Sequence, residues 1–326
     1  MFQFVYWLKA FAAILITNSH YADIWPVSRL AMGGHLGNCL YFFVSGFCLY
    51  SIRNSFPGWY AKRIVRIYPA LWIVAAINLL VGFWRADGPM AYIHYLIYPT
   101  WYHFIASILV LYIVYYILRR VQMRLNIQTI WLLLLTLAVY LTAYLLWCDK
   151  SYYHIDDVEE KWCRFQFMAS MLVGALCREN YEKLRVRISA MEIIELAGTF
   201  AAYFAVKLLI SRNAVSSYFQ FLLPVIQVLL IYFIGVLAVK LEKRGAFSRA
   251  PAAMQKAAAA LAGISLEVYL TQNYIISRLG HLAFPINFLV VTGVILLCSY
   301  AVHKAAECIQ RGCRKLLHPK TSPKEV

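Results

Sequence analysis

Two residues whose side chains could move a proton or hold an anion lie eleven positions apart in the first apolar stretch, Lys9 and His20. Eleven residues of α-helix turn through about 1100°, which is about 20° past three full turns, so both side chains lie on one helical face. They are then about 16 Å apart along the helix axis. An imidazole is a general base suited to neutral pH, and an ammonium group binds negative charge.

Asp23 follows His20 by three residues. If the helix continues that far, the carboxylate lies one turn beyond the imidazole, where it could hold the second ring nitrogen and raise the basicity of His20. A second interpretation has equal weight and involves no chemistry. In it, Lys9 extends its amine to the inner headgroups and His20 caps the helix at the outer interface.

The composition indicates that these residues belong to a membrane protein. Of the 326 residues, 62% are hydrophobic and 14% are charged, whereas a soluble domain is about half apolar and about a quarter charged. Apolar runs of about twenty residues recur, which is the length that crosses a bilayer as a helix, and backbone hydrogen bonding in lipid requires helices. We expect about ten spans, at residues 2–21, 37–52, 68–84, 101–118, 128–148, 164–178, 190–210, 217–239, 261–279 and 285–303.

The distribution of Lys and Arg predicts the orientation of these spans. With ten spans both termini lie on one side, and placing that side in the cytoplasm puts 22 of the 31 Lys and Arg residues in or beside inner segments, against eight outside. This is the positive-inside pattern. It accounts for the formal net charge of +16, so we expect no nucleic-acid partner. The inner segments are 53–67, 119–127, 178–189, 240–260 and 304–326.

The expected fold class is therefore all-α and polytopic, with both termini cytoplasmic. We expect one transmembrane domain over residues 1–310 and a basic cytoplasmic tail over residues 311–326. The segment 246–262 is too polar and too rich in alanine to span, and we expect it to lie as a helix at the inner interface. The expected location is the cell (cytoplasmic) membrane, in contact with membrane lipid.

Further candidates lie in the second expected span and the inner loop after it. Ser45 and Gly46 follow aromatic residues, and small residues there allow close helix packing. A nucleophilic role for Ser45 is less favoured, because the G-x-S-x-G elbow is absent. Arg63 and Arg66 share a helix face and suit phosphate oxygens, although basic residues also flank inner spans for topological reasons.

Together these motifs resemble those of the acyltransferase-3 family of membrane acyltransferases. The resemblance rests on the lysine–histidine spacing in the first span and on three sequence segments. It covers the first 70 residues and recurs near the C-terminus, and the ten expected spans agree with it. The segments are FFVSGF at 42–47, RIVRIYP at 63–69 and GISLEVYLTQ at 263–272.

The resemblance implies an enzyme that takes an acyl group, most often acetyl, from cytoplasmic acyl-CoA. The group would pass to a hydroxyl of a surface polysaccharide, lipid-linked glycan or related acceptor, so the implied partners are an acyl-CoA donor and a glycan or glycolipid acceptor. Residues at the family's motif positions are expected to bind the donor, with the arginines on the CoA phosphates. They are Lys9, Ser45, Arg63, Arg66 and Tyr68.

The expected mechanism uses His20 as the general base, helped by Asp23, while a sugar hydroxyl attacks the thioester. One position departs from the family pattern, because the late motif ends in histidine in many members and Gln272 stands there. Glu267 lies in the same span, where an unpaired carboxylate is costly, so we expect it to be neutral, paired or beside a polar cavity. A catalytic role for Glu267 and a helix-pairing role have equal weight.

The histidines show no metal-ligand spacing, so we expect no metal cofactor. Two other functions stay open. A transporter or flippase would use the intramembrane charges for coupling, but no pair of Gly- or Pro-broken spans recurs in two halves. A non-catalytic partner in polysaccharide export is favoured by Gln272 and opposed by the intact basic and histidine motifs. The sequence determines neither the acceptor nor the oligomeric state.

Overall fold

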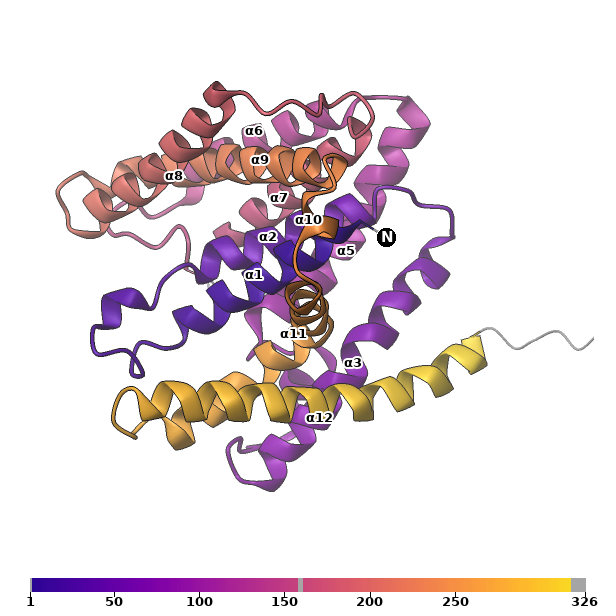
Figure 1. Ribbon diagram of the computed structural model, residues 1–326, viewed down its shortest axis with the longest axis vertical. Helices are drawn as coiled ribbons and strands as arrows, with labels where there is room; N and C mark the ends of the chain where they lie inside the picture. Colours follow the sequence, from indigo (N-terminus) through magenta and orange to yellow (C-terminus); the bar gives the residue numbers. More distant parts are fainter. Residues whose placement is uncertain (1, 158–160, 318–326) are drawn as a thin grey trace, which may run out of the picture. The chain divides into compact units, whose positions relative to one another are not determined.

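The computed structural model describes residues 2–157 and 161–317, and over these residues the secondary structure is helical, without strands (Figure 1). This confirms the all-α prediction. In chain order the α-helices are α1 (Gln3–Ser19), α2 (Gly34–Cys48), α3 (Phe56–Leu80), α4 (Pro89–Tyr92), α5 (His103–Leu125), α6 (Thr129–Trp147), α7 (Trp162–Glu179), α8 (Ala190–Ser211), α9 (Leu222–Lys243), α10 (Ala246–Arg249), α11 (Ala252–Leu279) and α12 (Ile286–Leu317). Shorter 3₁₀ and π turns are η1 (Ser28–Leu30), η2 (Ile93–Ile97) and η3 (Ser217–Phe221).

Six helical segments in the described part of the chain are long and apolar enough to cross a membrane. They coincide with the third, fourth, fifth, seventh, eighth and tenth expected spans. The other four expected spans are also helical, as α1, α2, α7 and α11, and the count of ten and the cytoplasmic termini stay predictions. The six segments are Phe56–Leu80, His103–Leu125, Thr129–Trp147, Ala190–Ser211, Ser217–Lys243 and Ile286–Cys313.

Three helices extend beyond their expected limits. α3 begins at Phe56, so Lys62, Arg63 and Arg66 lie on its first turns. The segment 246–262 is helical, as α10 and the first turns of α11, and α11 continues from Ala252 into the expected span because alanine is a strong helix former. Its position at the inner interface stays a prediction. α12 continues past residue 310 to Leu317, and residues 318–326 of the expected tail lie outside the described residues.

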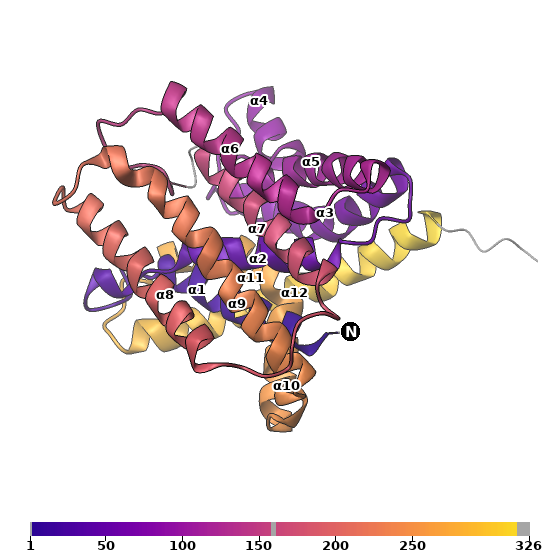
Figure 2. The same ribbon diagram turned by 90° about the horizontal axis from the view of Figure 1, so that it is seen from above.

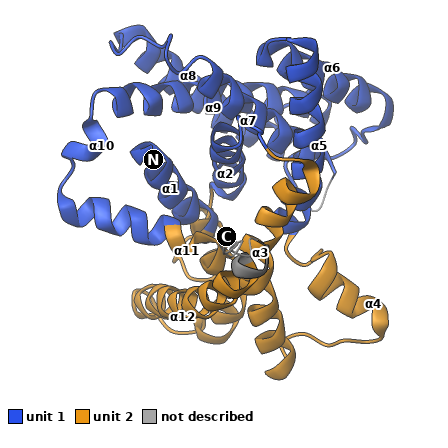
Figure 3. Ribbon diagram, turned by 90° about the vertical axis from the view of Figure 1, so that its right-hand side faces the viewer, with its two compact units in different colours: residues 1–16, 33–53, 103–262 blue, residues 17–32, 54–102, 263–326 orange. Residues whose placement is uncertain are grey.

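The chain forms two compact units (Figure 3). Unit 1 comprises residues 1–16, 33–53 and 103–262, and unit 2 comprises residues 17–32, 54–102 and 263–326. Unit 1 is therefore built around α2 and α5 to α9, and unit 2 around α3 and α12.

The centre of unit 1 is α7, which packs against α2, α6 and α9, while α8 lies beside α9 (Figures 1 and 2). Two glycines let α2 and α7 approach closely. A Cβ built on Gly46 would lie 1.8 Å from the Met171 carbonyl oxygen, and one on Gly174 would lie 2.0 Å from the Phe43 carbonyl oxygen. As membrane spans, α2 would be short and α7 would be polar. Both helices are surrounded by protein, and a helix that is buried in protein needs no continuous apolar surface.

In unit 2, α3 packs against α12. Two side chains of α3 also hold the π turn that follows α4. The Tyr68 hydroxyl donates to the Ile97 carbonyl at 2.5 Å, and the Trp72 indole donates to the Leu96 carbonyl at 2.9 Å. The segment expected as an outer loop at 85–100 is thus partly helical and attached to α3.

Candidate functional site

His20 lies immediately after α1, which ends at Ser19. Its amide donates to the Thr17 carbonyl at 3.0 Å, and the chain then turns, with the Ile24 amide donating to the Tyr21 carbonyl at 3.0 Å. The helix therefore does not continue to Asp23. The side chains of His20 and Asp23 are both exposed, and within the described residues no hydrogen bond joins them, so the structure does not form the expected His–carboxylate pair.

The segment after His20 is attached to the beginning of α12. The Tyr21 hydroxyl shares a hydrogen bond with the Thr292 hydroxyl at 2.9 Å, and the Asn287 side-chain nitrogen donates to the Ile24 carbonyl at 3.0 Å. The rings of Trp25 and Phe288 are 5.0 Å apart. These contacts fix the level of His20 along α12.

The two arginines lie on the first turns of α3 in different surroundings. The Arg63 guanidinium donates to the Trp59 carbonyl at 2.6 Å and lies over the Trp59 ring, 4.1 Å from its centre. Arg66 is exposed, and its backbone carbonyl accepts a hydrogen bond from the Gln310 side-chain nitrogen at 3.2 Å. Both arginines therefore lie near the far end of α12 from His20.

The remaining candidates from the first three expected spans are divided between the two units. Lys9 and Ser45 are half-buried residues of unit 1, and Ser45 adjoins the Gly46 contact between α2 and α7. Tyr68 belongs to unit 2, where its hydroxyl is hydrogen-bonded to backbone. Gly46 and its neighbours therefore support the packing interpretation of this segment.

Glu267 is paired. The residue is 3% exposed, and Oε1 lies 3.0 Å from Nδ1 of His303 on α12. One turn further along α11, the Thr271 hydroxyl meets the Ser299 hydroxyl at 2.9 Å. The second carboxylate oxygen, Oε2, is buried without a hydrogen-bond partner. No sequence pattern pointed to His303, because this partner is 36 residues from Glu267 and only helix packing brings the two together.

Gln272, which stands where many family members have histidine, is completely buried in α11. Neither its amide oxygen nor its amide nitrogen has a hydrogen-bond partner. Because buried polar groups are almost always paired, such an amide marks a place where water or a ligand group would bind.

The contacts of α12 follow a single polar stripe. The side chains at 292, 299, 303 and 310 are separated by steps of seven, four and seven residues, so they lie within about 40° of one another around the helix. Their partners are Tyr21, Thr271, Glu267 and Arg66 in that order. At a rise of about 1.5 Å per residue, the first and last levels are about 27 Å apart, and the His303 level is about 16 Å from the first.

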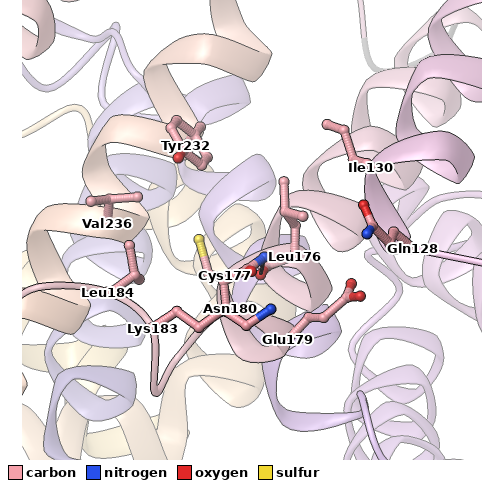
Figure 4. Close-up of a pocket in the computed structure, with 10 residues that line it drawn as sticks. All are labelled: Gln128, Ile130, Leu176, Cys177, Glu179, Asn180, Lys183, Leu184, Tyr232 and Val236. Atoms are coloured by element: carbon pink, nitrogen blue, oxygen red, sulfur yellow. Dashed lines mark hydrogen bonds between the residues drawn. The ribbon is translucent and has the colours of Figure 1, made fainter.

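A pocket of about 430 Å³ opens in unit 1 beside the start of α6, the end of α7 and one side of α9 (Figure 4). Two polar residues of the lining form hydrogen bonds with backbone groups at helix ends. The Glu179 carboxylate accepts a hydrogen bond from the Thr129 backbone amide at the start of α6, and the Asn180 side chain donates to the Leu176 carbonyl at the end of α7, both at 3.0 Å. The candidate residues from the sequence are not among those that line it. The lining is Gln128, Ile130, Leu176, Cys177, Glu179, Asn180, Lys183, Leu184, Tyr232 and Val236.

Comparison with known proteins gives one match. A family model for acyltransferase 3, described as an acyltransferase domain, matches residues 2–304. No curated protein and no solved structure matches the chain. The matched range runs from α1 into α12 and so includes the candidate residues of both units.

Proposed function

Because the chain belongs to the acyltransferase-3 family, we propose that it is an O-acyltransferase acting on a hydroxyl of a surface or lipid-linked glycan. The family makes the protein a membrane acyltransferase, and its apolar helices make it a multi-pass membrane protein. The proposal adds cytoplasmic acyl-CoA as the donor, with acetyl as the first choice of acyl group, and the cell membrane as the location.

The observation that carries the proposal is the spacing of contacts along α12. Tyr21, the neighbour of His20, contacts Thr292, whereas Arg66 contacts Gln310. The separation of about 27 Å between these levels is close to the hydrocarbon thickness of a bilayer, about 30 Å. It supports a reaction in which the donor and the acceptor approach from opposite faces of the membrane.

On the donor side, Arg63 and Arg66 would hold the phosphates of CoA. A guanidinium donates two parallel hydrogen bonds and carries a permanent charge, so a pair three residues apart suits a polyphosphate. The extended arm of CoA would then direct its thioester along α12 toward the level of His20. Lys9, Ser45 and Tyr68 match motif positions of the family, and we assign them to the donor side on that basis alone.

On the acceptor side, His20 would act as the general base. Its imidazole takes the proton of the acceptor hydroxyl as that oxygen attacks the thioester carbonyl, and the carbon–sulfur bond breaks to release CoA as a thiolate. The imidazolium proton then passes to the thiolate or to water, which leaves an ester and free CoA. General-base catalysis of this kind is typically worth about 10²–10⁴-fold in rate.

The test uses inverted and right-side-out vesicles that contain the protein and its native glycans, supplied with radiolabelled acetyl-CoA. Label should enter the glycan fraction only when acetyl-CoA reaches the cytoplasmic face. The variant His20→Ala should lower this transfer by about 10²-fold or more. His281→Ala is the matched control, since His281 is an exposed histidine of unit 2 outside the proposed site and should keep wild-type activity.

Transfer of label that persists in His20→Ala would remove His20 from the mechanism. Absence of both glycan labelling and CoA release in the wild type would first require other acyl donors to be tested. If those also fail, the transporter or flippase becomes the favoured function, because it needs no CoA release. A non-catalytic export partner would instead keep its role in export when His20 is replaced.

A further inference from the structure

A second histidine lies in unit 1 within a buried polar cluster of α2, α7 and α9. His35, in the first turn of α2, is 8% exposed and stacks on Phe167. Its Nε2 atom lies 2.7 Å from Oε1 of Gln166 and 2.9 Å from Oε1 of Gln227. Polar side chains buried within a membrane protein are costly and are therefore candidates for function.

The two glutamines determine which ring nitrogen of His35 carries the proton. The Gln166 side-chain nitrogen donates to the Ile155 carbonyl at 2.8 Å, and the Gln227 side-chain nitrogen contacts the Cys39 sulfur at 2.6 Å. Both amide oxygens therefore face His35. Because Nε2 meets two acceptors, it must carry the hydrogen, and in the neutral ring Nδ1 is then a hydrogen-bond acceptor.

That acceptor is unused. His35 Nδ1 is buried without a hydrogen-bond partner, and so is the side-chain oxygen of Asn38, which is itself only 6% exposed. The two residues are three apart on α2, so their side chains are neighbours on one face, with Cβ atoms about 5–6 Å apart. The face thus presents two acceptors and lacks the donors that would satisfy them.

A charged pair adjoins the cluster. Asp156 and Lys207 form an ion pair at 2.5 Å and act electrostatically on His35. Burial alone would raise the pKa of the Asp156 carboxyl, but the Lys207 ammonium and His35 hold that pKa below its ordinary value. An ionised carboxylate only accepts hydrogen bonds, so Asp156 does not supply the missing donors at Nδ1 and Asn38.

We propose that His35 Nδ1 and the Asn38 side-chain oxygen form a subsite that accepts hydrogen bonds from two neighbouring hydroxyl groups of a sugar or other polyol. The inference rests on the proposed function only in treating this polyol as the acceptor of the acyl group. A diol supplies two donors to two fixed acceptors, whereas an ether of the same shape supplies none. The subsite would therefore select hydroxyl-rich acceptors and reject their alkylated analogues.

The experiment observes the imidazole directly, in full-length protein labelled with ¹⁵N-histidine and reconstituted in lipid nanodiscs. The chain has eight histidines, and the spectrum of His35→Gln identifies the signals of His35. We expect an unprotonated Nδ1 whose resonance moves when ethane-1,2-diol is added and stays in place when 1,2-dimethoxyethane is added. Asn38→Leu, which removes one acceptor at nearly constant volume, should weaken the diol titration about tenfold.

Tyr140→Phe is the matched control, because the Tyr140 hydroxyl is also buried in unit 1 without a partner and should not affect the titration. Three results would overturn the subsite and leave an ordered water as its occupant. They are a protonated Nδ1, an Nδ1 resonance that does not move when the diol is added, and an equal shift with the diol and with its ether. These outcomes do not depend on acyl transfer. A protein that binds the diol as expected but releases no CoA would contradict the proposed function alone.

Discussion

Arg63 and Arg66 occupy equivalent positions in the sequence motif, yet their surroundings differ. The Arg63 guanidinium is engaged with the carbonyl and the ring of Trp59, which orients it and reduces its freedom to follow a ligand. Arg66 contributes only its backbone carbonyl to the contact with Gln310, and its side chain is exposed. At the scale of single residues, Arg66 is therefore the better placed to meet a mobile phosphate, and Arg63 is the better ordered.

We predict that Arg66→Ala raises the Michaelis constant for acyl-CoA about tenfold, because one charge-assisted hydrogen bond to phosphate is lost. Arg63→Ala should have a smaller effect on binding and a larger effect on thermal stability, since Trp59 loses its partner. Lys62→Ala is the control, an exposed neighbour outside the motif. The Michaelis constant is measured by steady-state kinetics with varied acyl-CoA concentration. If it is unchanged in both arginine variants, Arg63 and Arg66 do not bind the phosphates of CoA.

Glu267 offers a second prediction at this scale. Glu267→Leu should lower stability by about 1–3 kcal/mol, because it leaves the His303 ring nitrogen without its partner. Glu267→Gln keeps an oxygen at that position and should unfold close to the wild-type temperature. If Glu267 only pairs helices, the glutamine variant also keeps its activity. A stable but slow glutamine variant would instead assign the carboxylate a part in the reaction.

The sequence could identify Glu267 as a group that needs a partner, but it could not name His303. The same limit applies to His35, which had no motif to mark it, although its contacts with Gln166 and Gln227 define its tautomer. Local spacing was informative where one helix carries both residues, as for the arginines. The proposed pair of His20 and Asp23 failed to form because α1 ends at Ser19, before the turn that would have aligned them.

At the scale of elements, unit 1 depends on the contact between α2 and α7. Both helices carry a glycine where the other helix presents a carbonyl, so backbone lies directly against backbone. The apolar pattern could predict that these segments are helices, since both were expected near their observed positions. It could not predict that they pack together, because the signal is two single glycines separated by more than a hundred residues.

We predict that Gly46→Ala or Gly174→Ala destabilises the protein by about 1–3 kcal/mol or more, because the new Cβ must push the helices apart. Gly198→Ala in α8 is the matched control in the same unit. A Cβ there meets no other atom within 4 Å, and replacing a glycine inside a helix should add about 0.5–1 kcal/mol. In thermal unfolding measured in detergent, Gly198→Ala should have the highest melting temperature of the three variants. A melting temperature of Gly46→Ala or Gly174→Ala at or above that of Gly198→Ala would disprove the close contact between α2 and α7.

At the scale of the whole molecule, the excess of Lys and Arg predicts which loops face the cytoplasm. The part of this predicted topology that most needs a test is α7, which was expected to span the membrane although it is not among the six long apolar helices. The charged residues Arg164, Arg178 and Glu179 near its two ends lower its hydropathy. Gln166 and Ser170 within it are buried, and such side chains are tolerated where they meet protein instead of lipid. The orientation of every later loop depends on whether this helix crosses the bilayer.

Two variants, each with one cysteine on a different side of α7, test whether this helix crosses the membrane. In a background without the eight native cysteines, Ser151→Cys should react with a membrane-impermeant maleimide on intact cells. Glu182→Cys should react only after the cells are permeabilised. Both positions are exposed. Labelling of both from one side would mean that α7 does not cross, and the opposite pattern would invert the whole topology.

The polar stripe of α12 also limits how the length of this protein can change in evolution. Adding one residue between Thr292 and Ser299 would rotate everything beyond it by about 100° and turn His303 and Gln310 away from their partners. Adding seven would restore the face but displace it by about 10 Å along the axis. Exposed side chains on the other faces of α12 can diverge, whereas insertions and deletions inside the helix should be absent among descendants that keep the contacts of Glu267 and Arg66.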